Sequence, residues 1–456
     1  MRTHLHAFSR VVAGLWIGLL VSCGGGGYGG GSSRPQATVS ISVEPTTITL
    51  GQTATVTWNS NGTTCTASGA WNGVKGGSGS EVVTPTATGM FTYSLLCSGG
   101  GYTESQTLSA TLTVNAMSGF VPTSLVSQFA GTAAPTTDSR LTNPRGIAFA
   151  PNVPVRVVNS TTATAYDGNG KSASSGMMEN MIGRAFDSTA IVANASPDFI
   201  VKANGKLGPA EFIYAGKAGM ISGTSSAVDR VTAVPMYTAT DGAVYTGLTI
   251  ASNGKGTFLY ATDFHGKKID VMDASLTRQA RSTESFAFSD PALPAGYAPF
   301  GIQAVENRAA GSTQIYVSYA QQLAPDNRDN AVGAGLGLVN VFDTNGKLLR
   351  QLVPAGVALN APWGMALAPA DFGTFSNALL IGNSGDGKIN AFDPVKGTFI
   401  GTLSDSDARP IVTRGLRGIA FGNDSNDQPH NALFFTAGTD AADGSFGRID
   451  LISSQR

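Results

Sequence analysis

The chain is poor in charged residues: Asp, Glu, Lys and Arg together make up 13% of its 456 residues, against about 25% in an average globular protein. The 29 Lys and Arg and the 30 Asp and Glu give a formal charge of −1, and basic residues form no run. The clustered positive charge of nucleic-acid-binding proteins is therefore absent, and we expect no nucleic-acid partner. The chain instead contains 58 glycines, which favour strands and turns over helices.

Histidine and cysteine are also scarce, with four and three residues. His4 and His6 lie in the N-terminal leader, which leaves His265 and His430, both in polar turn-like segments, to act as an imidazole base. No GxSxG segment stands between a strand and a helix, so the serine-hydrolase pattern is missing. We assign no catalytic residue, and these absences favour a binding protein over an enzyme.

The first 23 residues indicate export. Arg2 and Arg10 flank a short basic region, and the apolar run VVAGLWIGLLVS that follows is too short for a permanent membrane span. The sequence LVSC at 20–23 resembles the lipobox of bacterial lipoproteins, which implies a signal peptide at 1–22 and a lipid on Cys23. Residues 23–37 then form a flexible Gly/Ser-rich tether. Because no acidic residue follows Cys23 directly, the resemblance implies an outer-membrane or cell-surface location.

Residues 38–115 alternate polar and apolar positions in short runs such as VSISVEP and TLSATLTV. Such runs, with turn residues about every 8–12 positions, predict an all-β sandwich. With Cys23 assigned to lipid, Cys65 and Cys97 remain, and an even pair in an exported chain predicts a disulfide that could staple the two sheets. The phrases around these cysteines resemble small bacterial Ig-like modules, which implies a spacer or adhesion unit.

Residues 118–456 contain a repeated phrase. APWGMALAP at 361–369 recurs as NPRGIAFAP, APFGIQAV and LRGIAFGN, which begin at residues 143, 298 and 416. After APWGMALAP the pattern predicts four strands joined by Gly- and Asp-rich turns, at 363–368, 378–383, 387–392 and 398–403. A repeated four-stranded unit of about 40–60 residues is typical of a β-propeller.

Six copies of the unit can be aligned, of which the one at 196–225 is degenerate. The last copy stops after its third strand, whereas TSLVSQFAG at 123–131 stands before the first copy. We expect this segment to supply the outermost strand of the last blade, because that pairing closes the ring and removes an open sheet edge. The predicted fold is all-β, an Ig-like sandwich followed by a six-bladed β-propeller.

Long phrases within 123–452 resemble an uncharacterised family of bacterial exported propeller proteins, some of which carry a PEP-CTERM sorting tail. The phrases are LTNPRGIAFAP, DPALPAGYAPFGIQ and LNAPWGMALAPADFGTFSNALLIGNSGDGKINAFDP. The GIAF phrases are also similar to NHL repeats, a propeller class used mainly for binding. The resemblance implies the fold without an activity. The chain departs from the family in ending with ISSQR, without a sorting tail, and in having the lipobox.

One position of the repeated phrase varies between blades. The innermost strand of a propeller blade borders the central channel, and the residue before the recurrent glycine should lie near one mouth. Two guanidinium groups and two aromatic rings at this position could hold an anionic or sugar-like ligand. Alternatively, its charged members pair with one another and plug the channel. The six residues are Arg145, Asp198, Thr246, Phe300, Trp363 and Arg417.

A second set of residues ends the second strand of four blades: Asn159, Asp263, Tyr319 and Asn383. Carboxylate and amide oxygens beside a channel suit a hard cation such as Ca²⁺. Six-bladed lactonases use such a centre but surround the metal with more carboxylates than occur here. Ca²⁺ could bind, but no cofactor is predicted.

The sequence thus predicts a lipid-anchored envelope protein that presents its propeller to a small molecule, a glycan or a surface protein. The alternative is a hydrolase or lyase acting at the channel mouth, and a third interpretation is a self-associating matrix component. The low density of carboxylates and histidines in the two expected rings favours binding.

Overall fold

The computed structural model describes residues 34–115, 119–173, 179–181, 187–307, 311–439 and 443–452. The chain divides into two compact units, residues 1–116 and 117–456. Both are built from strands, and the one helical element among the described residues is η1, a 3₁₀ turn at Gly373–Phe375. No helix in the described part of the chain is long and apolar enough to cross a lipid bilayer.

Unit 1 is a small sheet structure with the strand order β1-β3-β5-β6-β2, in which β4 also pairs with β3. A bulge between Asn59 and Thr64 interrupts the long strand β3, so that its first part pairs with β1 and its second part with β5. The buried side of the sheet contains Trp58, Trp71 and Tyr93, packed edge to face. The strands are β1 (Val39–Glu44), β2 (Thr47–Thr49), β3 (Ala54–Gly69), β4 (Gly73–Val83), β5 (Gly89–Ser98) and β6 (Leu108–Asn115).

Cys65 and Cys97 form the predicted disulfide, but it does not join two sheets. The two residues are direct register partners on β3 and β5, with their Cα atoms 4.0 Å apart. The expected staple is therefore wrong, because the strands that carry the cysteines are already hydrogen-bonded neighbours. The resemblance of this unit to bacterial Ig-like modules stays a prediction.

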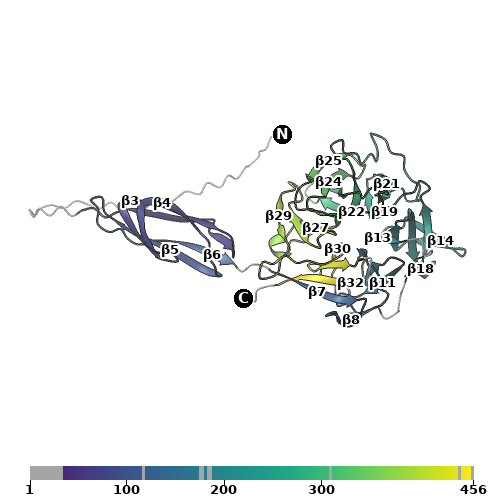
Figure 1. The fold of residues 1–456 in the computed structure, drawn as a ribbon, viewed down its shortest axis with the longest axis horizontal. Helices are drawn as coiled ribbons and strands as arrows, with labels where there is room; N and C mark the ends of the chain where they lie inside the picture. The colour runs from purple at the N-terminus through teal and green to yellow at the C-terminus, as the bar shows by residue number, and fades with distance from the viewer. Residues whose placement is uncertain are drawn as a thin grey trace, which may run out of the picture. The chain divides into compact units, whose positions relative to one another are not determined.

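Unit 2 is a β-propeller, seen face-on in Figure 1. Its innermost strands contact one another in order around a closed ring, since the last of them also contacts the first. A hydrophobic cluster fills the space between each pair of neighbouring sheets. The core is thus divided into six wedges, and each sheet is stabilised by burial on both of its faces.

We number the sheets from 1 to 6 in chain order and name the innermost strand of each first. Sheet 1 contains β9 (Gly146–Ala148), β10 (Val155–Val158), β11 (Thr162–Tyr166) and β12 (Glu179–Met181). Sheet 2 contains β13 (Ser188–Ala193), β16 (Phe212–Gly216), β17 (Met220–Ser225) and β18 (Asp229–Thr238). Sheet 3 contains β19 (Tyr245–Ser252), β20 (Thr257–Asp263) and β21 (Lys268–Met272).

Sheet 4 contains β22 (Tyr297–Asn307), β23 (Ser312–Gln321), β24 (Leu338–Asp343) and β25 (Leu348–Val353). Sheet 5 contains β26 (Pro362–Leu367), β27 (Leu379–Asn383), β28 (Ile389–Phe392) and β29 (Phe399–Thr402), close to the four strands predicted there. Sheet 6 contains β30 (Leu416–Phe421), β31 (Leu433–Ala437), β32 (Ser445–Leu451) and β7 (Phe120–Ser127), to which the short β8 (Thr136–Thr137) adds in parallel.

The ends of unit 2 meet in sheet 6. Strand β7, which precedes sheet 1 in the chain, pairs antiparallel with β32 at the other end, from Ser127 opposite Ser445 to Phe120 opposite Leu451. This is the pairing expected for the segment at 123–131. It joins residues more than 300 positions apart and leaves β32 without a free edge.

Sheet 2 departs from the prediction. Its innermost strand is β13, which precedes the segment expected in that place. The predicted strand instead forms a separate hairpin of β14 (Ile200–Ala203) and β15 (Lys206–Pro209). At the outer edge, β18 pairs in parallel with β12 and so joins sheets 1 and 2.

The recurrent glycine lets neighbouring innermost strands approach closely. A Cβ atom built on Gly301 would lie 2.0 Å from the carbonyl oxygen of Trp363 in the next sheet. At Gly418 the same atom would lie 2.6 Å from the carbonyl oxygen of Arg145. Only glycine fits such contacts, which confirms the expected role of this position in packing around the axis.

Candidate functional site

Five of the six residues predicted to line the channel lie together at one mouth. They border a pocket of about 410 Å³, which falls in the size range of small-molecule sites. The five residues are Arg145, Thr246, Phe300, Trp363 and Arg417. The repeated phrase therefore places its variable position at this mouth in sheets 1, 3, 4, 5 and 6.

Trp363 spans the mouth. Its indole N–H donates to the carbonyl oxygen of Thr246, two sheets away, at 2.9 Å. Its ring lies 4.7 Å from that of Phe300, centroid to centroid, and the guanidinium carbon of Arg417 lies 5.5 Å from the indole centroid. Three contacts thus hold the indole in place, so we assign it to the floor of the pocket and not to a free stacking surface.

Arg145 is buried at the base of the same pocket, with 5% of its surface exposed. One terminal nitrogen donates to the carboxylate of Asp187 and, at 2.9 Å, to the carbonyl oxygen of Ser188. Its Nε has no hydrogen-bond partner among the described residues. The positive charge of this guanidinium group therefore lies at the base of the pocket.

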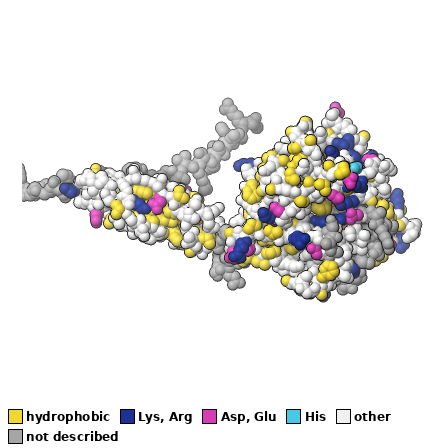
Figure 2. Space-filling model, in the orientation of Figure 1, with side chains coloured by type: hydrophobic (Ala, Val, Ile, Leu, Met, Phe, Trp, Pro, Cys, Tyr) yellow, Lys and Arg dark blue, Asp and Glu magenta, His cyan; other side chains and the backbone are white. Residues whose placement is uncertain are grey.

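The pocket carries a surplus of positive charge. Figure 2 shows Lys and Arg side chains, with acidic ones beside them, near the centre of the ring on one face. Among the described residues that line the pocket, Asp329 is the one acid, and it pairs with Lys217 at 2.7 Å. The five cationic lining residues are Arg145, Lys217, Arg328, Arg414 and Arg417. Of these, Arg328 and Arg414 are exposed, and the prediction from sequence had included neither them nor Lys217.

Two acids beside the pocket offset part of this charge. Asp187 pairs with Arg145. Hydrogen bonds from Thr439, and more weakly the charge of Arg414, lower the pKa of Asp443. Among the described residues, the cations still outnumber the acids at the mouth.

Asp198 does not lie at this mouth. It precedes the separate hairpin β14–β15, and the innermost strand of sheet 2 supplies Thr189 to the channel instead. Thr189 donates from Oγ1 to the carbonyl oxygen of Tyr245 at 2.7 Å, just as Thr246 donates to that of Phe300 at 2.7 Å. The predicted pairing of Asp198 with Arg145 or Arg417 is therefore wrong, and Asp187 takes that role for Arg145.

Hydroxyl groups on the second strands join neighbouring sheets, a feature that the sequence analysis missed. Ser318 accepts the N–H of Gly301 at 2.9 Å and donates to the carbonyl oxygen of Pro362 at 2.8 Å. Thr436 accepts the N–H of Gly418 at 3.0 Å and donates to the carbonyl oxygen of Arg145 at 2.8 Å. A Ser or Thr in the middle of an otherwise apolar second strand is the sequence pattern that indicates these bonds between sheets.

The second predicted ring does not face the channel. Its members are at most 2% exposed and line none of the pockets at the axis: Asn159, Asp263, Tyr319 and Asn383. Asp263 shows why, because it accepts the N–H groups of Val244 and Gly266, each at 2.9 Å, and pairs with Lys268 at 3.1 Å. These polar groups stabilise turns inside the sheets.

No group of three or more His, Cys, Asp or Glu side chains within the described ranges is arranged to hold a metal ion. His265 and His430 line different parts of unit 2, and His430 is exposed between two carboxylates. Its Nδ1 lies 2.8 Å from Asp424 and its Nε2 lies 3.1 Å from Asp371. The carboxylates, Asp424 first, raise the pKa of His430.

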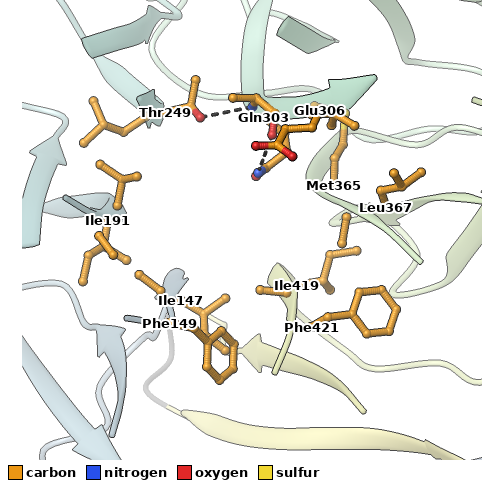
Figure 3. A pocket seen from close by; sticks show the side chains of 18 residues that line it. Ile147, Phe149, Ile191, Thr249, Gln303, Glu306, Met365, Leu367, Ile419 and Phe421 are labelled. Atoms are coloured by element: carbon orange, nitrogen blue, oxygen red, sulfur yellow. Dashed lines mark hydrogen bonds between the residues drawn. The ribbon is translucent and has the colours of Figure 1, made fainter. Parts of the chain in front are cut away.

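The opposite mouth differs in chemistry. Figure 3 looks into a pocket of about 470 Å³ there, ringed by Ile147, Ile191, Met365 and Ile419 from four sheets. The charged residue in its lining is Glu306. The sheets run clockwise in this view and anticlockwise in Figure 1, so the two figures show opposite faces of the ring.

No family model matches the sequence. The chain is 32% identical over 330 residues to the uncharacterized protein R648 of Acanthamoeba polyphaga mimivirus, an alignment that covers 69% of this chain and 76% of that protein. The chain belongs to the R648 family. Two further mimivirus relatives are R640, at 33% identity over 39% of this chain and 31% of its own length, and L690, at 34% over 45% and 51%.

The chain is also similar to solved structures of low sequence identity. A protein of unknown function from Bacteroides thetaiotaomicron superposes with a TM-score of 0.46 at 11% identity, covering 91% of this chain and 99% of that one. An auxiliary nutrient binding protein from Bacteroides ovatus gives 0.44 at 11% identity over 91% and 98%. At these identities and scores, the names of those proteins do not transfer to a member of the R648 family.

Proposed function

We propose that the propeller of this chain binds a small anionic molecule at the cationic mouth. One observation supports this above all others: of the described residues that border this pocket, five are Lys or Arg and one is acidic. In a chain with balanced charge overall, such local excess is not an average surface property. It raises the local concentration of anions and speeds their association.

The chemistry of the pocket fits a carboxylate or phosphate group. Guanidinium groups form paired hydrogen bonds to planar anions, and the pocket is lined by exposed Arg328 and Arg414 and by half-buried Arg417. Partial burial strengthens such bonds because water screens them less. The ring of Trp363, held by Thr246 and Phe300, forms an apolar floor for the body of the ligand.

We further propose that the protein is exported and anchored by a lipid on Cys23, with residues 38–115 as an Ig-like spacer. Cys23 and the leader lie outside the described residues, so the support comes from the apolar run and the LVSC ending. The disulfide of unit 1 fits an oxidising compartment. Replacing Cys23 by Ser should move the protein from the membrane to the soluble fraction, and unchanged membrane association would contradict the anchor.

The binding proposal is tested on the purified full chain by calorimetric titration with acetate, citrate, glucuronate and phosphate. Arg417→Gln should weaken the binding of any anion that the wild type takes by about tenfold, because a charged hydrogen-bond donor is lost. Arg230→Gln is the matched control, since Arg230 is exposed on β18 and lines no part of the mouth. Equal losses in both variants, or none in either, would contradict the assignment of the site.

A further inference from the structure

The connection between β23 and β24 is unusual among the sheets. It runs from residue 322 to 337, sixteen residues, whereas the same connection takes three to seven residues in the other five sheets. These connections all lie at the cationic mouth, where the second strand ends. Long insertions on a regular scaffold commonly serve binding, so the insert at 322–337 calls for a functional account.

The insert has a defined shape. At its base, Gln322 is buried and donates from Nε2 to the carbonyl oxygen of Phe264 in sheet 3 at 2.6 Å. The N–H of Leu323 donates to the carbonyl oxygen of Asp329, and the N–H of Ala331 to that of Gln321, each at 2.8 Å. These bonds close the insert on itself and fix the part that borders the pocket.

That part places a carboxylate among the cations. Asp329 contacts Lys217, which follows β16 in sheet 2, across 112 positions of sequence. Both side chains are solvent-accessible, Asp329 by 67% and Lys217 by 31%. The carboxylate is therefore held at the mouth by one ion pair that water can replace.

Resting on the function proposed above, we infer that the mouth takes a small polycarboxylate and that Asp329 occupies part of its site in the free protein. The five cations come from sheets 1, 2 and 6 and from the insert of sheet 4, so one carboxylate cannot pair with all of them. A ligand with two or more separated carboxylates can. The carboxylate of Asp329, paired with Lys217, is the anionic group that the mouth holds in the free protein, and it is the model for the ligand's own carboxylates.

Competition follows from this arrangement. A ligand carboxylate that pairs with Lys217 must displace Asp329 or share the lysine with it, and two like charges side by side repel each other. Asn at position 329 would keep the shape of the side chain and lose the charge. Since an exposed ion pair contributes up to about 1 kcal/mol, removing the competitor should tighten binding by roughly fivefold.

The experiment titrates the full chain with citrate, with acetate as the single-carboxylate probe and trigalacturonate as the glycan-borne one. Asp329→Asn should bind citrate or trigalacturonate roughly fivefold more tightly than the wild type. The matched control is Asp326→Asn, because Asp326 is exposed on the same insert and does not line the pocket. The control should bind as the wild type does, and acetate should bind far more weakly than either larger probe.

Several outcomes would overturn the inference. Citrate binding that Arg417→Gln weakens and Asp329→Asn leaves unchanged would exclude the competition and leave the proposed function standing. Acetate binding as tight as citrate binding would exclude the need for several carboxylates. If neither the wild type nor Asp329→Asn bound any anion, the proposed function would fail together with the inference.

Discussion

At the scale of single residues, the repeated phrase divides between packing and the candidate site. The glycine leaves room for a carbonyl oxygen of the next sheet where any side chain would clash: a Cβ atom built on Gly364 would lie 2.5 Å from the carbonyl oxygen of Arg417. A hydroxyl from the second strand, such as that of Thr436, bonds to both neighbours. The residue before the glycine differs from sheet to sheet, and in five of the six sheets it borders the pocket.

Gly301→Ala should lower the free energy of unfolding by about 2–3 kcal/mol, because the added methyl would meet the carbonyl oxygen of Trp363 at 2.0 Å and must displace backbone. Gly256→Ala is the matched control: its nearest neighbour would be a ring carbon of Phe258 at 3.6 Å, an ordinary contact. Urea denaturation of the two variants measures the difference. Equal stability would mean that the inner strands can separate without cost.

At the scale of strands, the sequence pattern predicted those strands whose position depends only on nearby residues. The four strands of sheet 5 follow from alternating apolar residues and from turns such as 384–388, so their bounds were predicted to within two residues. Sheet 2 was mispredicted because its innermost strand, STAIVA at 188–193, lacks the glycine phrase, while the hairpin at 200–209 imitates a strand pair. The disulfide partners were identified by count, but their place on adjacent strands depends on the register of β3 and β5.

The residues of the candidate site were likewise predicted only where the local sequence identified them. Arg145 and Arg417 were found because they belong to the repeated phrase. Lys217, Arg328 and Arg414 were not, since they lie in connections whose meeting point depends on the closed ring. Nothing in the local sequence of residues 322–337 indicates that Asp329 contacts Lys217 in another sheet.

One contact between two loops that connect strands should make the stability of the fold depend on pH. His430, in the connection after β30, bridges Asp424 and Asp371, and its pKa is raised. A raised pKa in the folded state stabilises the protein fully below the pKa of an unfolded histidine, about 6.5, and the effect is lost as the pH rises through the folded value. The wild type should therefore lose more Tm than His430→Gln between pH 6 and pH 8.5. Parallel Tm profiles of the two proteins would contradict this account.

At the scale of the whole molecule, stability depends on closing the ring. Each sheet buries its faces against two neighbours, so opening the ring exposes the two faces of one wedge, and sheet 6 is where the ends of the unit meet. Strands β30, β31 and β32 come from the C-terminal end of the unit, and β7, from its N-terminal end, completes their sheet. This pairing also fixes the positions of Arg417 and Arg145 on adjacent sheets, and so the cationic mouth depends on it.

A covalent link across this closure should therefore stabilise the propeller. The side chains of Ser124 on β7 and Ser445 on β32 meet across this pairing, with their Oγ atoms 3.2 Å apart, so we replace both residues by Cys to place a disulfide there. The bond would close a loop over 321 positions of sequence, and restricting so long a loop in the unfolded chain could stabilise the fold by up to about 5 kcal/mol. Thermal unfolding of the oxidised double variant should occur several degrees above that of the wild type, and reduction should abolish the gain.

Because Cys65–Cys97 is present in both proteins, only the new bond distinguishes them. An oxidised variant with an unchanged Tm would show that the ring opens elsewhere first, at a wedge other than the one sealed by β7.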